Sequence, residues 1–293
     1  MSTFKQMVDH TLSDLHGYVR DQEQSSHLIS NLTSNGLSVQ IASANRIPGT
    51  GRVEIDDELI WVDSVDLINN ALTVPPYGRG FDTTTAATHA SGTRVVSNPL
   101  FPRSVVKRAI NATILDTLGM IYGVGTTTFS YAAAVRTYAL PAATVAILQV
   151  SWQLPGPSGE WRIVQKFRYD QEDGTFGKSI SVFDPITPGR TVRVVYMTDP
   201  ATLVNDSDDF ATVTTLPPSC EDVITYGACA RLLSYIDSSR IDTSSTDPTN
   251  AAAVPVGSAS SVSKQMYAMF RQRLSEERAR LFGNYPTAVH YTR

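Results

Sequence analysis

The order in which helical and extended patterns follow one another is the feature that most restricts the fold of this chain. The spacing of the apolar residues changes near Gly36, Asn98, Gly125 and Pro217. Two blocks between these points consist of short alternating runs separated by turn sequences, which predict antiparallel strands. The strands do not alternate with helices, so a doubly wound parallel sheet is not expected.

Outside these blocks, apolar spacing predicts four helices, at residues 3–18, 102–119, 223–237 and 264–282. We therefore expect an α+β fold, with a helical core of about four helices interrupted by two antiparallel β insertions, the second of them sandwich-like. The expected domains are a discontinuous helical core of residues 1–35, 98–122 and 217–293, a small all-β module of residues 36–97, and a β-sandwich-like insertion of residues 123–216.

Two local patterns give sharper expectations for the strands. Residues 52–55 and 58–62 predict a hairpin whose turn contains Asp56 and Asp57. In the second block, residues 161–169 predict one continuous strand with alternating faces, with Trp161, Ile163, Gln165, Phe167 and Tyr169 on one face.

Composition narrows the class of protein. The chain has 293 residues, of which 42% are hydrophobic and 18% are charged, which is enough apolar material for a buried core. The formal net charge of −4 argues against a protein whose whole surface coats nucleic acid. No run of 18 apolar residues is present, so no transmembrane helix and no membrane partner are expected. The polar residues 1–10 do not resemble a secretion signal.

The chain has two cysteines, Cys220 and Cys229. If both lie on one helix, nine residues of helical rise separate them by about 13 Å, which is too far for a disulfide. No histidine is near them in sequence, so they do not form a zinc site by themselves. We expect two small buried thiols.

The search for a catalytic constellation gives weak signals only. His89 could combine with Asp82 and a hydroxyl group, but a structural role for His89 is favoured. The run of three carboxylates at residues 56–58 could suggest a glycosidase, yet neighbouring residues of a hairpin point to opposite faces, so we interpret the run as a solvated turn. The acidic residues of 205–209 do not have EF-hand spacing, and a solvated linker is favoured over a calcium site.

No nucleotide-binding motif is present either. The Gly-Val-Gly sequence at residues 123–125 follows a predicted helix, whereas a dinucleotide fingerprint follows a strand. We assign no catalytic, cofactor-binding or metal-binding residue, and we expect neither a cofactor nor enzyme activity.

Two residues of the long polar loop at 77–93 are candidates for organising that loop. Gly78 and Gly80 permit backbone angles that other residues avoid. Arg79, between them, has five N–H donors for neighbouring carbonyl or carboxylate groups. We expect Arg79 and His89 to hold the loop in shape.

A β-module that recurs in virion proteins of tailed bacteriophages is similar to part of this region. The likeness covers the sequences GRVEIDDE at residues 51–58, GRGFDTTTAATH at residues 78–89, and Gly92-Thr93. In the usual form Gly-Thr follows soon after Arg-Gly, whereas here Asp82-Thr83 stands in that place. The resemblance covers about a fifth of the chain.

A second resemblance concerns two helical segments. Residues 217–240, which include the sequence YGACAR at 226–231, and the charged residues 264–280 resemble the helical core of phage head–tail connector (adaptor) proteins. Those proteins form rings beneath the portal. The typical connector is shorter and mostly helical, so two β insertions are a departure from it.

These resemblances imply a structural virion protein of a tailed bacteriophage, a head–tail connector or adaptor in the neck, made in the cytoplasm of the bacterial host. They imply a ring of copies, twelve if the ring matches the portal, with the portal protein and a stopper or tail completion protein as neighbours. Genomic DNA would pass through the ring without sequence specificity. The alternative is a tail-tip or baseplate structural protein, and a virion-associated hydrolase is a third class.

The last predicted helix carries the candidate contact residues. Six basic and two acidic side chains give residues 264–293 a net charge of +4, which leaves −8 for the rest of the chain. One interpretation is a solvated amphipathic helix. In another, Arg271 and Arg273 face the DNA channel or the portal. In a third, the helix docks into an acidic portal groove through Phe270, Leu274 and the arginines.

Overall fold

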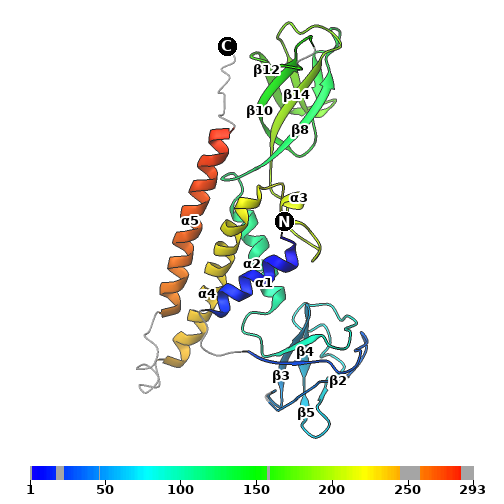
Figure 1. Ribbon diagram of the computed structural model, residues 1–293, viewed down its shortest axis with the longest axis vertical. Coiled ribbons are helices and arrows are strands. Elements are labelled where there is room, and N and C mark those ends of the chain that lie inside the picture. The colour runs from blue at the N-terminus through cyan, green and yellow to red at the C-terminus, as the bar shows by residue number, and fades with distance from the viewer. Residues whose placement is uncertain (1, 18–22, 46, 157–158, 245–257, 285–293) are drawn as a thin grey trace. The chain divides into compact units, whose positions relative to one another are not determined.

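The computed structural model describes the whole chain except residues 1, 18–22, 46, 157–158, 245–257 and 285–293. The chain divides into two compact units. The first, which we call the sandwich unit, consists of Met1–Met7, Asn111–Gly227 and Gln265–Arg293. The second, which we call the module unit, consists of Val8–Ile110 and Ala228–Lys264. Figure 1 labels many of the helices and strands of both units.

The four predicted helices are present and begin near their predicted positions, whereas the short helix α3 and the 3-10 turn were not predicted. The helical elements are α1 (Phe4–His16), α2 (Arg103–Asp116), α3 (Phe210–Thr214), the 3-10 turn η1 (Pro218–Cys220), α4 (Glu221–Ser244) and α5 (Ser258–Asn284). Helix α5 begins six residues earlier than Lys264, where the pattern places it. Within the module unit, the Ser263 hydroxyl donates a 2.8 Å hydrogen bond to the carbonyl of Ala230, a contact that apolar spacing does not indicate.

The expected helical core with two β insertions is wrong. Strands account for 31% of the residues and helices for 30%, and the fourteen strands of the described residues form four antiparallel sheets. One strand, β1 (Gln24–His27), lies inside the first stretch that we expected to belong to the helical core. Its sequence, QSSH, has no apolar alternation, and its strand is defined by antiparallel pairing with β7 (Arg94–Ser97), which periodicity cannot detect.

The module unit contains two of the sheets. Its further strands are β2 (Ser38–Gln40), β3 (Gly51–Ile55), β4 (Glu58–Val62), β5 (Ser64–Asp66) and β6 (Ala71–Thr73). The sheet orders are β1-β7-β3-β4 and β2-β6-β5. The predicted hairpin is confirmed, because β3 pairs with β4 from Gly51↔Val62 to Ile55↔Glu58. Apolar side chains of both sheets, among them Val39, Ile55 and Leu72, form one buried cluster.

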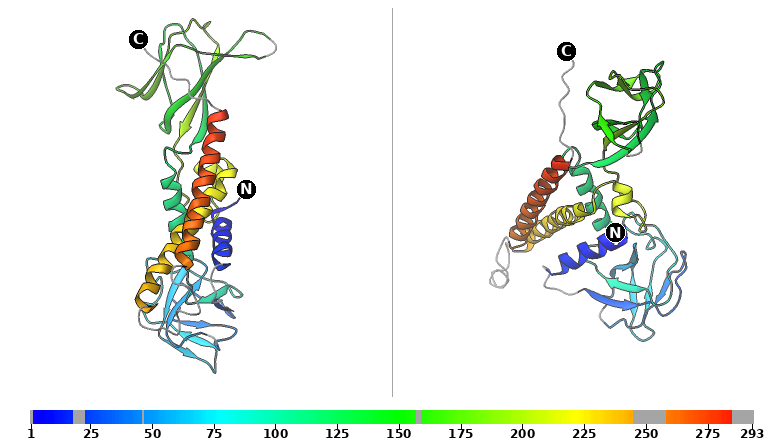
Figure 2. Two further views of the ribbon diagram at one scale, coloured as in Figure 1. Left: turned by 90° about the vertical axis from the view of Figure 1, so that its left-hand side faces the viewer. Right: turned by 45° about the horizontal axis from the view of Figure 1, so that its top comes forward.

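The sandwich unit contains the other two sheets, which Figure 2 shows from two further directions. The strands are β8 (Gly123–Ser130), β9 (Thr137–Ala139), β10 (Thr144–Gln153), β11 (Trp161–Ile163), β12 (Phe167–Asp173), β13 (Gly177–Val182) and β14 (Thr191–Thr198). The orders are β11-β10-β14-β8 and β12-β13-β9. Side chains of the two sheets, including Val150, Ile180 and Val194, form a shared apolar core.

The continuous strand expected at residues 161–169 is divided between two sheets. β11 pairs with β10, whereas β12 pairs with β13. Val164, between them, is fully buried, and its N–H donates to the carbonyl of Val150. The chain therefore crosses from one sheet to the other at this point, and alternation alone gives no sign of such a crossing.

Both cysteines are buried free thiols, as expected. Cys220 is the last residue of η1 and lies in the sandwich unit, while Cys229 lies in α4 and in the module unit. Burial raises the pKa of each thiol to about 12. Among the described residues, none of the helices combines the length and the apolar content needed to cross a bilayer.

Candidate functional site

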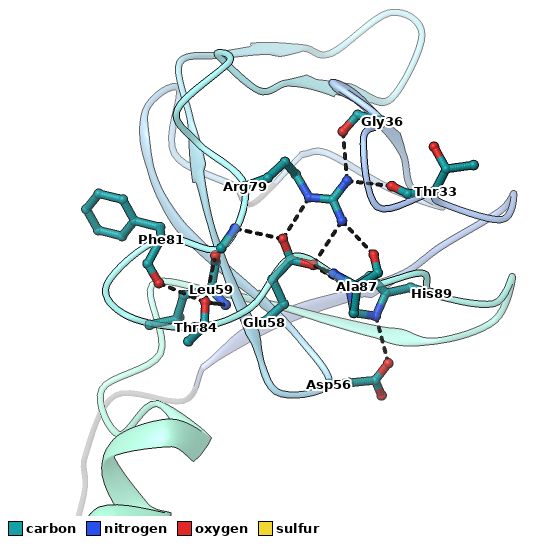
Figure 3. Close-up of polar contacts among 11 residues, drawn as sticks. Thr33, Gly36, Asp56, Glu58, Leu59, Arg79, Phe81, Thr84, Ala87 and His89 are labelled. Carbon is teal, nitrogen blue, oxygen red and sulfur yellow. Dashed lines mark hydrogen bonds and ion pairs between the residues drawn. The ribbon is translucent and has the colours of Figure 1, made fainter.

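Arg79 lies at the centre of a buried hydrogen-bond network in the module unit (Figure 3). Its Nε donates to Oε1 of Glu58 at 2.7 Å and its Nη2 to Oε2 at 2.9 Å. The remaining N–H groups donate to the carbonyls of Thr33 at 2.6 Å, Gly36 at 2.9 Å and Ala87 at 2.7 Å. All five guanidinium donors therefore have acceptors, and three of these are carbonyls in two separate segments, the turn at residues 33–36 and the loop at Ala87.

Glu58 joins the hairpin to this loop. It is the first residue of β4, and its side chain is 1% exposed. Besides Arg79, the carboxylate accepts from the backbone N–H groups of Gly80 and Ala87 and from Nε2 of His89, each at 2.9 Å. Burial by itself raises the pKa of Glu58, but the hydrogen bonds from Arg79, His89 and the two backbone groups outweigh it and lower the pKa to about 2.

His89 has a carboxylate at each ring nitrogen. Nδ1 lies 2.9 Å from Oδ2 of Asp56, and Nε2 lies 2.9 Å from Oε2 of Glu58. The hydrogen bonds to Asp56 and Glu58 raise the pKa of His89 to about 9 against the opposing effect of burial. The imidazole is therefore protonated at neutral pH, and both of its N–H groups donate.

The backbone of the loop also pairs with its surroundings. Trp61 N–H donates to the carbonyl of Gly78, and Phe81 N–H donates to the carbonyl of Leu59, so the loop covers the open edge of β4. Gly78 fits closely here, because an added Cβ would lie 2.6 Å from the carbonyl oxygen of Trp61. Gly80 has φ of 60°, which favours glycine. The two glycines thus let the loop lie against β4 with Arg79 directed inward.

This arrangement suits fixation of a loop and does not suit proton transfer. A histidine whose two N–H groups both donate to carboxylates has no lone pair with which to accept a proton. Two positive and two negative side chains meet in the network, so its formal charges balance. Within the part of the chain that the structure describes, no three His, Cys, Asp or Glu side chains are placed to hold a metal ion.

The four candidate residues of α5 have different environments in the sandwich unit. Phe270 and Leu274 are buried, and Phe270 packs against Gly227, where an added Cβ would lie 3.0 Å from its ring. Arg273 is 33% exposed and is surrounded by carboxylates: Glu276 at 2.7 Å, Asp222 at 3.6 Å and Glu277 at 3.8 Å. Arg271 is exposed and makes no ion pair with any residue that the structure describes.

The buried carboxylate of Glu277 links α5 to the residues before α4. It accepts a 2.8 Å hydrogen bond from the hydroxyl of Ser219, and Arg280 lies 3.6 Å away on its own helix. Together with the contact between Phe270 and Gly227, this bond holds residues 265–284 of α5 in the sandwich unit. The structure therefore places Arg79 and His89 in one network and the α5 residues in a separate region, with Arg271 alone turned outward.

Comparison with protein families decides the identity. The family model described as SU10 adaptor protein matches residues 54–287, which is well over half of the chain. The chain belongs to the SU10 adaptor protein family. No curated protein matches it.

Membership agrees with the likeness to a phage head–tail adaptor that the sequence indicated. This adaptor is a phage structural protein, and such a protein interacts with other structural proteins of the phage. The matched residues include Glu58, Arg79, His89 and the described part of α5, whereas Asp9 and β1 precede the matched range.

Sequence analysis missed a second ionic cluster of the adaptor, at the N-terminus of α2. Nη1 of Arg103 lies 2.6 Å from Oδ1 of Asp9, and its Nε lies 3.3 Å from Oδ1 of Asp57. Lys107 contacts the other oxygen of Asp57 at 2.7 Å. The backbone N–H of Arg103 donates to the buried carboxyl of Glu54 at 2.6 Å. The cluster ties β3 and its turn to α1 and α2.

Our interpretation of residues 56–58 as a solvated turn is therefore wrong for Glu58 and incomplete for Asp57. A signal was available in the sequence. Glu54 and Glu58 lie within apolar runs, where a buried carboxylate needs hydrogen-bond or charged partners. Arg103 lies at the start of a predicted helix, and the first N–H groups of a helix attract carboxylates.

Proposed function

We propose that this adaptor forms a ring between the portal and the tail of a tailed phage, with twelve copies if the ring follows the portal, and that genomic DNA passes through it. The observation that carries this proposal is the family match, which extends from β3 through both β regions into α5. The work of the adaptor would be assembly and continuity of the channel, with the portal protein on one side and a stopper or tail completion protein on the other.

A ring component has to keep its contact loops in one shape while neighbours are added. The Arg79 network supports such a role, because buried charge-assisted hydrogen bonds fix side chains more firmly than exposed ones. Arg79 holds the carbonyls of Thr33 and Gly36 in one turn and that of Ala87, about fifty residues further along the chain. In this proposal, Arg79 and His89 organise the loop and take no part in chemistry.

For the channel, the proposal assigns a role to Arg271. Its charge has no carboxylate partner among the described residues, whereas three carboxylates surround Arg273. In a ring, each copy would add one such charge, and contacts with DNA would be limited to phosphates, since a conduit must accept any sequence. Phe270 and Leu274 are buried, and in this proposal they support the helix from within.

Labelled virions provide the direct test. A tag at the N-terminus of the adaptor, detected by gold particles in negative stain, is expected at the neck, and averaging of the neck should show a closed ring that contains the fold described above. A label at the tail tip would replace this proposal with a baseplate role. Absence of the protein from purified virions would overturn both.

A further inference from the structure

Strand β8 is an edge strand without the usual protection against pairing. It is eight residues long, has the sequence GVGTTTFS, and contains no charged residue and no proline. Its pairing with β14 is regular over all eight residues, with no bulge. Proteins ordinarily blunt such an edge with charges, prolines, bulges or a covering segment. β8 has none of these among the described residues.

The free backbone groups of β8 can be assigned from its pairing. Tyr131 N–H donates to the carbonyl of Arg190, so the pair 131–190 is hydrogen-bonded, and hydrogen-bonded pairs recur at every second residue. Phe129 and Thr127 therefore bond to β14. The N–H and C=O groups of Thr126, Thr128 and Ser130 point away from β14, and the side chains of these three residues are exposed.

Other long edges of the adaptor are closed or guarded. The edge of β4 is covered by the Arg79 loop through Gly78 and Phe81. The edge strand β12 carries four charged residues and a register irregularity, as its sequence FRYDQED and its pairing show. The bare edge of β8 is therefore not a general property of this fold, and it suits an extended strand as its occupant.

The opposite edge of the same sheet is β11, which exposes apolar side chains. Trp161 is 37% exposed and Ile163 is 59% exposed. Val164 N–H donates to the carbonyl of Val150, and Leu154 N–H donates to the carbonyl of Glu160. Hydrogen-bonded pairs recur at every second residue, so Trp161 and Ile163 are in non-hydrogen-bonded pairs with β10. Their backbone N–H and C=O groups therefore point away from β10. β11 thus offers a short free edge whose side chains gain from being covered.

The directions of the two edges match. Each of the three neighbouring pairs in the order β11-β10-β14-β8 is antiparallel, so β11 and β8 run in opposite directions. A second copy related by rotation about an axis along the strands would bring its β8 beside β11 of the first copy in the antiparallel sense. Such a head-to-tail contact is heterologous, and heterologous contacts form a ring when the rotation between copies closes.

We propose that β8 of one copy of this adaptor adds to β11 of the next copy and extends the sheet from subunit to subunit. The occupant of the β8 edge is thus a second copy of this chain. The inference rests on the proposed ring and names the surface that would build it. Trp161 and Ile163 would be covered by the threonine-rich strand, and no charge of β8 would lose its hydration on pairing.

Proline substitutions test this at full chain length. Thr128→Pro and Ile163→Pro each remove an outward N–H group that the fold does not use, and edge positions tolerate proline. Thr128→Val and Ile163→Val keep the N–H groups and serve as controls. Circular dichroism and thermal melting verify folding. By sedimentation velocity over a range of concentrations, the parent and both valine variants should self-associate, while each proline variant should associate at least about tenfold more weakly.

Mixing the two proline variants gives the sharpest result. The Thr128→Pro copy keeps a free β11 edge and the Ile163→Pro copy keeps a free β8 edge, so an equimolar mixture should form a one-to-one dimer and nothing larger. The proposal is overturned if either proline variant self-associates like the parent; for Ile163→Pro, such a result would indicate pairing of β8 with β8. It is also overturned if the mixture stays monomeric or if the parent is monomeric at every concentration. A monomeric parent would not contradict the proposed function, because the labelling of virions tests the location of the adaptor independently.

Discussion

The backbone N–H of Arg103 donates a 2.6 Å hydrogen bond to Oε1 of Glu54, so a buried carboxyl group stands at the first residue of α2. Burial raises the pKa of Glu54 to about 7, and the hydrogen bond and charge of Arg103 only partly oppose this effect. Because the pKa is raised from 4.5, the stabilising contribution of this group is complete below about pH 4.5 and is lost as the pH rises through 7.

Glu54→Gln should remove this pH dependence, since the amide oxygen can still accept the hydrogen bond but does not ionise. We expect parent and variant to have similar free energies of unfolding near pH 4 and the variant to be more stable at pH 8 by roughly 3 kcal/mol. Urea denaturation at both pH values provides the measurement. Glu172→Gln, at an exposed position of β12, is the control. An equal difference at both pH values would contradict the assignment.

Arg79→Ala should be strongly destabilising. It leaves the carboxylate of Glu58 buried without its cation and frees three carbonyls, and the loss of one partner from a buried pair costs about 3–5 kcal/mol. Arg79→Lys keeps the charge but not the fork of donors, so we expect an intermediate loss. Arg168→Ala, at an exposed position, should change the urea midpoint little. If Arg79→Ala behaves like this control, the network does not hold the loop.

His89 should titrate well above the usual range for histidine. Its contribution to stability is present below about pH 6.5 and is lost as the pH rises through about 9, because the folded state binds the proton more tightly. The chemical shift of the His89 ring protons should follow this titration directly. His89→Gln should lower stability by roughly 2 kcal/mol at pH 6, and less at pH 10. A midpoint near 6.5 would show that Asp56 and Glu58 do not hold the proton.

Gly78→Ala should open the loop at β4. The new methyl group would lie 2.6 Å from the carbonyl oxygen of Trp61, so either the loop or the strand has to move. We expect a loss of about 1–3 kcal/mol. Gly174→Ala provides a matched control, because a methyl group there meets no atom within 4 Å. Thermal melting of the two variants measures the difference, and equal melting temperatures would contradict close packing at Gly78.

Arg271→Glu and Arg273→Glu form a matched pair on α5. If Arg271 faces the channel or a partner, its reversal should reduce the yield of infectious particles without lowering the stability of the isolated protein. Reversal of Arg273 instead places a fourth carboxylate beside Asp222, Glu276 and Glu277, so it should lower stability. If Arg271→Glu particles assemble and eject DNA normally, Arg271 has no role in the channel or in partner binding and belongs to a solvated surface.

The extent to which the sequence predicted the fold differs between elements. The β3–β4 hairpin was predicted because its strands alternate and its turn is polar. β1 was missed, since QSSH becomes a strand only through its pairing with β7. The expected strand at 161–169 was divided, because Val164 is buried where the chain changes sheets. Each miss concerns pairing between residues far apart in sequence, which local periodicity does not encode.

The candidate site shows the same limit. Arg79 and His89 stood out because glycines and a polar loop surround them, and the structure places both on Glu58. The sequence places Glu58 in a solvated turn, because neighbouring residues of a hairpin point to opposite faces. Its burial depends on residues 79–89 folding back over β4, a contact that spans more than twenty residues of sequence.

The two buried cysteines allow local unfolding of the adaptor to be measured by thiol labelling. Cys220 belongs to the sandwich unit and Cys229 to the module unit, and each thiol has to be exposed before a labelling reagent can attack it. The labelling rates of Cys220→Ala and Cys229→Ala variants therefore give separate opening free energies for the two units. Equal opening free energies would mean that the two units open in one cooperative event, whereas unequal values would identify the unit that opens more readily.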